Sequence, residues 1–148
     1  MRVRSFLKVM GTIGMFFVLT GCTPSTPGIG IPGENTQTTK SPEGIRWMLQ
    51  SFGYTKQAVP TGAYLFLDGG RFDAYNGCNH IGGHYRLGKE KLRLDPETST
   101  LVACLDHGLS DRVGRELAAV RFYRIDEQGR LLLYPHKGST PTLIFRAQ

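Results

Sequence analysis

The stretch Tyr75–Tyr85, YNGCNHIGGHY, brings together side chains that could bind a metal ion or form a crosslink. Cys78 and His80 form a C-x-H pair, and Cys104 and His107 form a C-x-x-H pair further along the chain. Two cysteines and two histidines are a common ligand set for tetrahedral zinc. Their spacing differs from that of standard zinc fingers. We keep a metal-binding or hydrolytic protein that uses these four residues as the alternative to a disulfide between the two cysteines.

The N-terminus indicates the compartment in which these cysteines lie. A basic start precedes the uncharged run Val9–Thr20, which is typical of a secretory signal and too short for a permanent membrane-spanning helix. LTGC follows, which matches the lipobox of bacterial lipoproteins. We therefore predict that residues 1–21 are a signal peptide and that Cys22 carries a diacylglycerol with palmitate-type chains. Two acyl chains suffice for stable anchoring in a membrane.

An exported chain favours a disulfide over a zinc site. The chain has three cysteines, and acylation of Cys22 leaves Cys78 and Cys104 as an even pair. Such a pair in an oxidising compartment is normally bonded. A bridge between them would be worth about 3 kcal/mol on a chain-entropy estimate. The sequence contains no C-x-x-C motif, so a thioredoxin-like redox role has no support.

The glycines around Cys78 are interpreted as structural residues. Gly77 would let the chain turn sharply into the cysteine, and Gly82 with Gly83 would let it reverse into the next strand. Asn79 is expected to fix the turn through a bond to nearby backbone. A phosphate-binding loop is disfavoured, because HYRL after the glycines is a strand pattern rather than the start of a helix.

We predict no catalytic residue, no resident metal and no cofactor. Ser99, Asp106 and His107 are residue types of a hydrolase triad. Nothing in their spacing places the serine in a nucleophile elbow or a similar context. The sequence therefore favours a protein that is not an enzyme.

The charge pattern disfavours nucleic acid as a partner. The chain has 18 Lys and Arg against 12 Asp and Glu, and loss of the signal would remove three basic residues and leave 15 against 12. A nucleic-acid binder clusters its basic residues on one face or one helix. Here they are scattered along the sequence.

Composition divides the exported chain into a tether and one domain. Residues 22–44 follow the signal, and Thr23–Gly44 holds four prolines and four glycines in 22 residues without an aromatic. Such a segment cannot form a core, so we predict a flexible tether with a reach of roughly 25 Å. Residues 45–148 are enough for one domain with a modest core.

Strand patterns dominate this domain, with one helix. The predicted strands are Ile45–Phe52, Ala63–Leu67, Arg71–Tyr75, Gly83–Leu87, Lys91–Leu94, Ser99–Cys104, Arg121–Ile125, Arg130–Tyr134 and Thr142–Phe145. Apolar residues at helical spacing predict a helix over Leu109–Val120, with Ser110 as its N-cap. We expect an α+β fold: a curled antiparallel sheet or partly open β-barrel with one covering helix.

Aromatic residues alternate along the first strands: Trp47, Tyr64, Phe66, Phe72 and Tyr75. Residues at this spacing are usually core residues of a sheet. The alternative is that they line a lipid-binding cavity within the barrel.

Several short motifs occur in a characteristic order. They are Trp47-x-Leu49, Gly77-Cys78-Asn79 with Gly83-x-Tyr85, Ser99-Thr100 with Ala103-Cys104, and then Glu116-Leu117, Tyr123-x-Ile125, Leu131-x-Leu133 and Leu143-x-Phe145. This order resembles the META domain of HslJ-like bacterial lipoproteins over nearly all of residues 45–148. The chain departs from the family pattern at His80, at Gly82 and at Leu101-Val102, where the family usually has Arg, Ser or Thr, and Arg-Met.

The resemblance implies a small α+β protein of the cell envelope with no family-wide enzymatic activity. It also implies loose links to stress response, drug tolerance and secretion, and a shape similar to secretin pilot lipoproteins, which bind a lipid or a partner peptide. We therefore expect an envelope lipoprotein, anchored in the membrane through Cys22, that binds or chaperones an envelope protein or a lipid. Thr23 in place of Asp favours the outer membrane, facing the periplasm.

Overall fold

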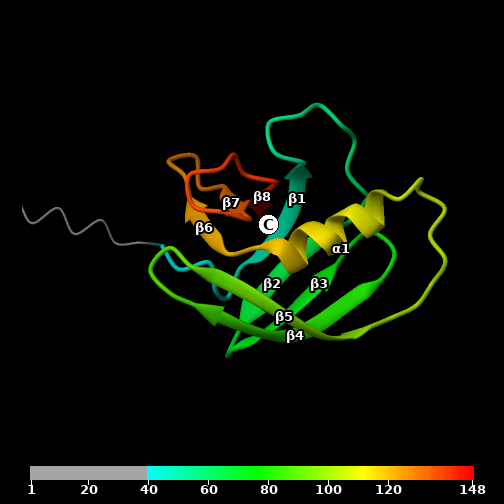
Figure 1. The fold of residues 1–148 in the computed structure, drawn as a ribbon, viewed down its shortest axis with the longest axis horizontal. Coiled ribbons are helices and arrows are strands. Elements are labelled where there is room, and N and C mark those ends of the chain that lie inside the picture. Colours follow the sequence, from blue (N-terminus) through cyan, green and yellow to red (C-terminus); the bar gives the residue numbers. More distant parts are fainter. Residues whose placement is uncertain (1–39) are drawn as a thin grey trace, which may run out of the picture. The chain divides into compact units, whose positions relative to one another are not determined.

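The computed structural model describes residues 40–148, so the predicted signal peptide, Cys22 and most of the predicted tether lie outside the described residues. The elements are β1 Arg46–Ser51, β2 Tyr64–Asp68, β3 Arg71–Tyr75, β4 His80–Leu87, β5 Leu92–Ser99, α1 Leu109–Ala119, β6 Phe122–Ile125, β7 Leu131–Tyr134 and β8 Leu143–Ala147 (Figure 1). Within this part of the chain, no helix is both long and apolar enough to cross a membrane.

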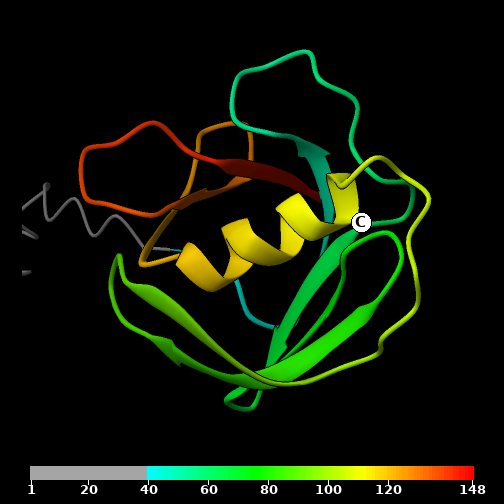
Figure 2. The ribbon, with the colours of Figure 1, turned by 45° about the vertical axis from the view of Figure 1, so that its right-hand side comes forward.

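The eight strands form one antiparallel sheet in the order β5-β4-β3-β2-β1-β8-β7-β6. The sheet curls until its two edges approach each other. They meet at a bridge between Lys91 and Phe122, beside a hydrogen bond of 3.1 Å from the Leu92 amide to the Arg121 carbonyl. Helix α1 crosses the hollow of the curled sheet (Figure 2). The predicted fold class, a curled sheet or partly open barrel with one helix, is confirmed.

The core fills the inside of this half-barrel. Alternate residues of the strands point inward, where they meet Val113 and Leu117 of α1 and Val120 just after it. Trp47 lies in this core, and its indole N–H donates to the Pro42 carbonyl at 2.7 Å, so its polar atom is satisfied. The hollow of the sheet is therefore occupied by side chains.

The predicted aromatic set does not line one cavity. Trp47 and Phe72 are core residues. Tyr64, Phe66 and Tyr75 are half-buried and alternate with core residues of β2 and β3, so they point to the outer face of the sheet. The five aromatics lie on opposite faces, which excludes a common lining.

The predicted strand Ser99–Cys104 is wrong. Strand β5 instead extends to Ser99, and the chain beyond it runs without regular structure to α1. Ser99 pairs with Ile81 of β4 and the Thr100 N–H bonds to the His80 carbonyl, but residues 101–104 pair with no neighbouring strand, which a strand requires. The bonds that hold these residues come from the turn before β4.

The predicted N-cap at Ser110 is also wrong. Gly108 occupies that position with φ 81°, and α1 begins at Leu109. Ser110 lies inside the first turn and is fully buried. Its backbone N–H donates to the Asp106 carboxylate at 2.7 Å, and its hydroxyl donates to the same carboxylate. Asp106 is therefore the side chain that holds the start of the helix.

Gly82 and Gly83 do not reverse the chain, because both lie within β4. The register between β4 and β5 shifts between these two residues. A Cβ atom on Gly83 would lie 2.2 Å from the carbonyl oxygen of Asp95 and 2.9 Å from Cα of Pro96. Gly83 is thus required for the close approach of β5 at a bulge, rather than for a turn.

Candidate functional site

The turn between β3 and β4 is held by a side chain that the sequence analysis did not single out. Asn76 is 5% exposed, and its Oδ1 accepts hydrogen bonds from the backbone N–H groups of Cys78 (3.0 Å) and Asn79 (2.6 Å). Gly77 has φ 98°, and a Cβ there would lie 2.1 Å from Cβ of Pro60. Gly77 thus permits the turn, and Asn76, rather than Asn79, bonds to the nearby backbone.

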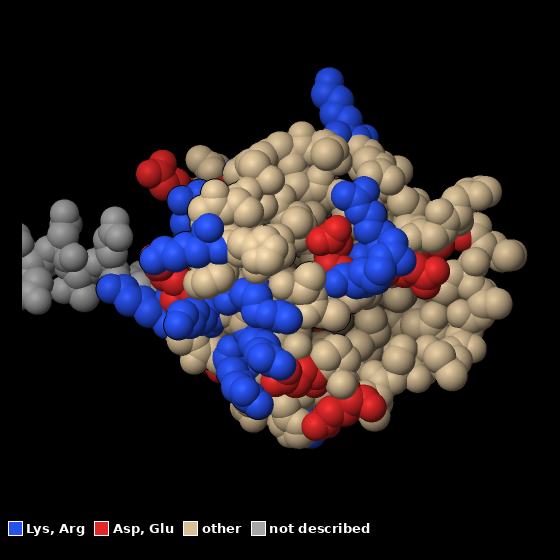
Figure 3. Space-filling view, viewed as in Figure 1, with Lys and Arg blue, Asp and Glu red and all other residues tan. Residues whose placement is uncertain are grey.

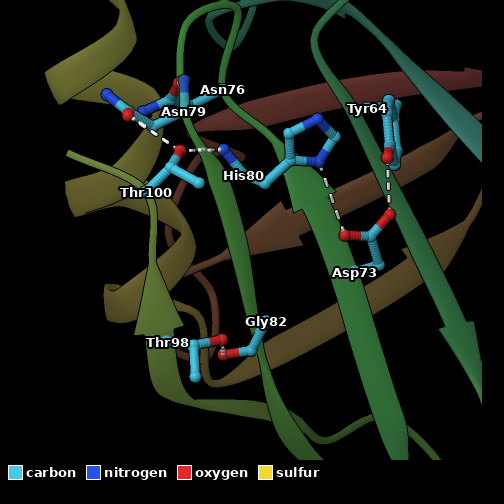
Figure 4. Close-up of polar contacts among 8 residues, drawn as sticks. All are labelled: Tyr64, Asp73, Asn76, Asn79, His80, Gly82, Thr98 and Thr100. Carbon is cyan, nitrogen blue, oxygen red and sulfur yellow. Dashed lines mark hydrogen bonds and ion pairs between the residues drawn. The ribbon is translucent and has the colours of Figure 1, made fainter. Parts of the chain in front are cut away.

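The side chain of Asn79 points across to the segment that follows β5. Its Oδ1 accepts from the Val102 N–H at 2.7 Å and from the Thr100 hydroxyl at 2.9 Å, and its Nδ2 donates to the Val102 carbonyl at 3.1 Å. Thr100 also pairs with the backbone of His80, and Figure 4 shows this connection. Asn79 therefore joins the turn to a segment more than 20 residues away.

A disulfide ties the same two segments together. Cys78 and Cys104 are bonded, with Cα atoms 6.0 Å apart and a sequence separation of 26. Cys78 lies in the turn fixed by Asn76, and Cys104 lies two residues beyond the Val102 group bound by Asn79. The crosslink and the amide contacts together hold residues 101–104, which pair with no strand.

The segment held in this way exposes apolar side chains. We name Leu101–Leu105 the apolar loop. Leu101 and Leu105 are each 96% exposed and Val102 is 60% exposed. These are three of the four large exposed hydrophobic residues in the described part of the chain. Exposed apolar residues that gather on a fixed scaffold often mark a binding site.

The apolar loop itself carries no charged side chain. The loop lies on the right of the domain in Figure 1, between β5 and α1. In the same view, Figure 3 shows mostly uncharged side chains at the right edge, with basic and acidic side chains beside them over α1; Lys and Arg also gather on the left, over β6 and the β4–β5 turn. A partner that contacts the loop itself would therefore meet apolar side chains rather than charged ones.

The end of the apolar loop is fixed to the helix. Asp106 accepts two hydrogen bonds from Ser110, and these bonds, the side-chain one above all, hold the pKa of its carboxyl below the usual value although partial burial opposes the shift. His107 and Gly108 both have positive φ angles, 54° and 81°, which turn the chain into α1. Both ends of the loop are thus anchored in the fold.

The alternative metal set is not brought together. The sulfur atoms of Cys78 and Cys104 bond to each other. Nδ1 of His80 lies 3.7 Å from the Asp73 carboxylate on the outer face of the sheet. Among residues 40–148, no three His, Cys, Asp or Glu side chains are grouped as metal ligands would be.

Ser99, Asp106 and His107, the residue types of a hydrolase triad, do not interact as a catalytic set. The Ser99 hydroxyl donates to the Thr100 carbonyl at 3.0 Å, and the Asp106 carboxylate is bound to Ser110. His107 follows Asp106 in the turn before α1. A nucleophile needs a base within hydrogen-bond reach, and Ser99 is instead engaged with the neighbouring main chain.

A polar cluster lies on the outer face of β2, β3 and β4. The Tyr64 hydroxyl donates to Asp73 at 2.5 Å, and His80 is the neighbour of Asp73 on the other side (Figure 4). Burial, together with this bond to Asp73, raises the pKa of Tyr64 to about 12. Further along the face, His84 contacts Glu97 at 2.7 Å. Mostly exposed pairs of this kind are typical of a solvated sheet face and contribute little stability.

Comparison with known proteins identifies relatives of this chain. The protein-family model described as the META domain matches residues 40–148. A solved structure described as the NMR structure of the protein from Burkholderia xenovorans is similar in fold, with a TM-score of 0.56 and 20% sequence identity. The match covers 86% of this chain and 98% of that chain. No match was found among curated proteins.

Proposed function

Because this chain belongs to the META domain family, with the family model covering residues 40–148, we propose that it is a lipid-anchored, non-catalytic binding protein of the bacterial cell envelope. Cys22 attaches it to the membrane, and its META domain binds or chaperones another envelope protein. The residues before the domain support the anchor, through a basic start, an apolar run and LTGC in register.

The single observation that carries the binding role is the apolar loop. Leu101 and Leu105 are almost fully exposed, although the segment that bears them is held by a disulfide and by Asn79. An exposed leucine side chain contributes no burial free energy to folding. When a partner covers it, its apolar surface is removed from water, which favours binding. A rigid loop loses less conformational entropy on binding than a flexible one. We therefore assign the loop as the contact surface.

The occupant we propose is a protein that offers apolar pockets. The loop itself holds no basic residue, which suits a protein partner better than an anionic membrane, since basic residues at the contact would be needed to favour anionic lipid. The filled core of the half-barrel favours binding at the surface over enclosure of a lipid inside the sheet. Localisation in the outer membrane, facing the periplasm, and a role in stress response remain part of this proposal.

The predicted lipid anchor at Cys22 is tested on the full-length protein isolated from its host cells. Intact-mass measurement is expected to show a chain that starts at Cys22 and carries acyl groups, and the cell fractions are expected to place it with the membrane. The variant Cys22→Ser should lose both the added mass and the membrane association. An unprocessed chain found in the cytosolic fraction would overturn the envelope assignment.

The contact surface is tested by photo-crosslinking in intact cells. A photoreactive residue is placed at position 101 or 105, and at the exposed Glu127 as a control. We expect positions 101 and 105 to give the same adduct with one envelope protein, identified by mass spectrometry, and position 127 to give none. The double variant Leu101→Asp with Leu105→Asp should abolish co-purification of that protein. Adducts to phospholipid, or no adduct from the loop, would contradict the proposal.

A further inference from the structure

A second surface feature lies away from the apolar loop, on the left of the domain in Figure 1. A cleft of about 360 Å³ is lined by residues of β6, β7, the loop between β7 and β8 and the β4–β5 turn, together with Tyr54. This volume is at the small end of the range for small-molecule sites. None of the residues that line it belongs to the apolar loop.

The floor of the cleft is aromatic. Phe122 of β6 and Tyr134 of β7 lie directly opposite each other in the ladder. Their neighbours Tyr123 and Leu133 point into the core, so Phe122 and Tyr134 point outward. Both are half-buried, and Tyr54 adds a third ring that is 66% exposed. The outer face of the sheet is thus apolar here, whereas across β2 to β5 it is largely polar.

The rim of the cleft is basic. Arg124 and Lys137 line it, and Glu90 is its one acidic residue. Arg124 lines the cleft together with Tyr134. Burial raises the pKa of Tyr134, and the charge of Arg124 opposes that rise. Within residues 40–148, neither Arg124 nor Lys137 takes part in an ion pair. Figure 3 shows Lys and Arg gathered on this same side of the domain.

These two features together define a ligand class. Aromatic rings stack with flat apolar groups, and a guanidinium binds a carboxylate through two parallel hydrogen bonds. We propose that the cleft between Tyr54, Phe122 and Tyr134 binds a small aromatic or fused-ring carboxylate, whose ring lies on the aromatic floor and whose carboxylate pairs with Arg124 and Lys137. This site is independent of the envelope partner proposed for the apolar loop.

The probe is 2-naphthoate, which carries a carboxylate on a flat fused ring. The matched neutral compound is 2-naphthalenemethanol, and the matched cation is 2-naphthylmethylamine. The full chain, purified from its host in detergent buffer, is titrated by calorimetry against a buffer blank. We expect 2-naphthoate to bind at one site and the alcohol to bind about tenfold more weakly, since a charge-assisted hydrogen bond is worth roughly that factor. The cation is expected to show no binding.

Matched variants locate the site. Arg124→Gln is expected to weaken 2-naphthoate about tenfold and to leave binding of the alcohol unchanged. Tyr54→Ser, at an exposed position, should weaken both compounds. Arg115→Gln, an exposed arginine of α1 that does not line the cleft, is the control and should change neither. Equal binding of the anion and the alcohol, insensitivity to Arg124→Gln, or no heat with 2-naphthoate would overturn the proposal.

Discussion

The side chain of Asn79 pairs with the main chain of Val102 through two hydrogen bonds, one accepted from its N–H at 2.7 Å and one donated to its carbonyl at 3.1 Å. An amide side chain presents a donor and an acceptor side by side, as a peptide group does. Asn79 thus satisfies a stretch of main chain that has no strand neighbour. A single buried side chain replaces the ladder that Leu101–Cys104 lacks.

This pairing predicts that the amide of Asn79 cannot be replaced by a carboxylate. Asn79→Asp keeps the size of the side chain but turns the donor toward the Val102 carbonyl into an acceptor. We expect a loss of about 1–3 kcal/mol in the free energy of unfolding, since the Val102 carbonyl would lose its donor and face a carboxylate oxygen instead. Denaturant titration measures the loss, and hydrogen exchange at the Val102 amide should become faster. Thr98→Ala, at an exposed position with one long bond of 3.5 Å, is the control and should change stability little.

The disulfide predicts a second, larger effect. Removing the Cys78–Cys104 bond frees a chain segment with a sequence separation of 26, so we expect the free energy of unfolding to fall by about 3 kcal/mol. The double variant Cys78→Ala with Cys104→Ala, compared with the parent with and without reducing agent, measures this. Reducing agent should destabilise the parent and leave the double variant unchanged. A parent whose melting temperature is insensitive to reduction would show that the bond contributes nothing.

The close approach of β5 to Gly83 predicts that a side chain at this position destabilises the fold, and Gly88 provides a matched control. In Gly83→Ala the added Cβ would lie 2.2 Å from a backbone oxygen, so β5 must move away from β4. We expect a loss of about 1–3 kcal/mol or more in stability. Gly88→Ala adds the same methyl group where its nearest neighbour would be 3.6 Å away, and it should cost little. Equal melting temperatures for the two variants would contradict the close approach of β5.

The fold was predictable where the determinants are local. The predicted strands Ala63–Leu67 and Arg71–Tyr75 correspond to β2 and β3, and the turn between them holds Gly69 and Gly70, both with positive φ. The helix over Leu109–Ala119 follows from its apolar spacing, and the C-terminal meander follows from alternation and turn residues. These features depend on residues within one element or one turn, which a sequence pattern records.

The errors occur where a distant segment decides the outcome. The apolar residues of Ser99–Cys104 predict a strand, yet the part of this segment beyond Thr100 is held by Asn79 and Cys78 and has no strand neighbour. Gly83 is required by the approach of β5, which lies beside it only in the folded sheet. The role of Asn76 in the turn could have been predicted from the sequence, since Asn followed by Gly is typical of a turn. The exposure of Leu101 and Leu105 had none, because hydrophobic residues in sequence are expected to be buried.

The turn between β6 and β7 predicts a dependence of stability on pH. The Asp126 carboxylate accepts from the Arg130 backbone N–H and from its Nε, both at 2.8 Å. Burial raises the pKa of Asp126, but the hydrogen bonds and charge of Arg130 outweigh it and hold the pKa below the ordinary value of 3.8. A lowered pKa in the folded state stabilises the protein above the unfolded value, and the effect is lost as the pH falls through the folded value.

Asp126→Asn is therefore expected to cost about 1–3 kcal/mol of unfolding free energy at pH 7, since it weakens charge-assisted bonds to Arg130. The cost should shrink as the pH falls below about 4 and vanish once the parent carboxyl is protonated. Denaturant titrations of parent and variant between pH 7 and about pH 2 measure this difference. Glu127→Gln makes the same charge change at the exposed neighbour and should follow the parent at every pH. A cost for Asp126→Asn that does not change with pH would mean that shape, rather than the ion pair, stabilises the turn.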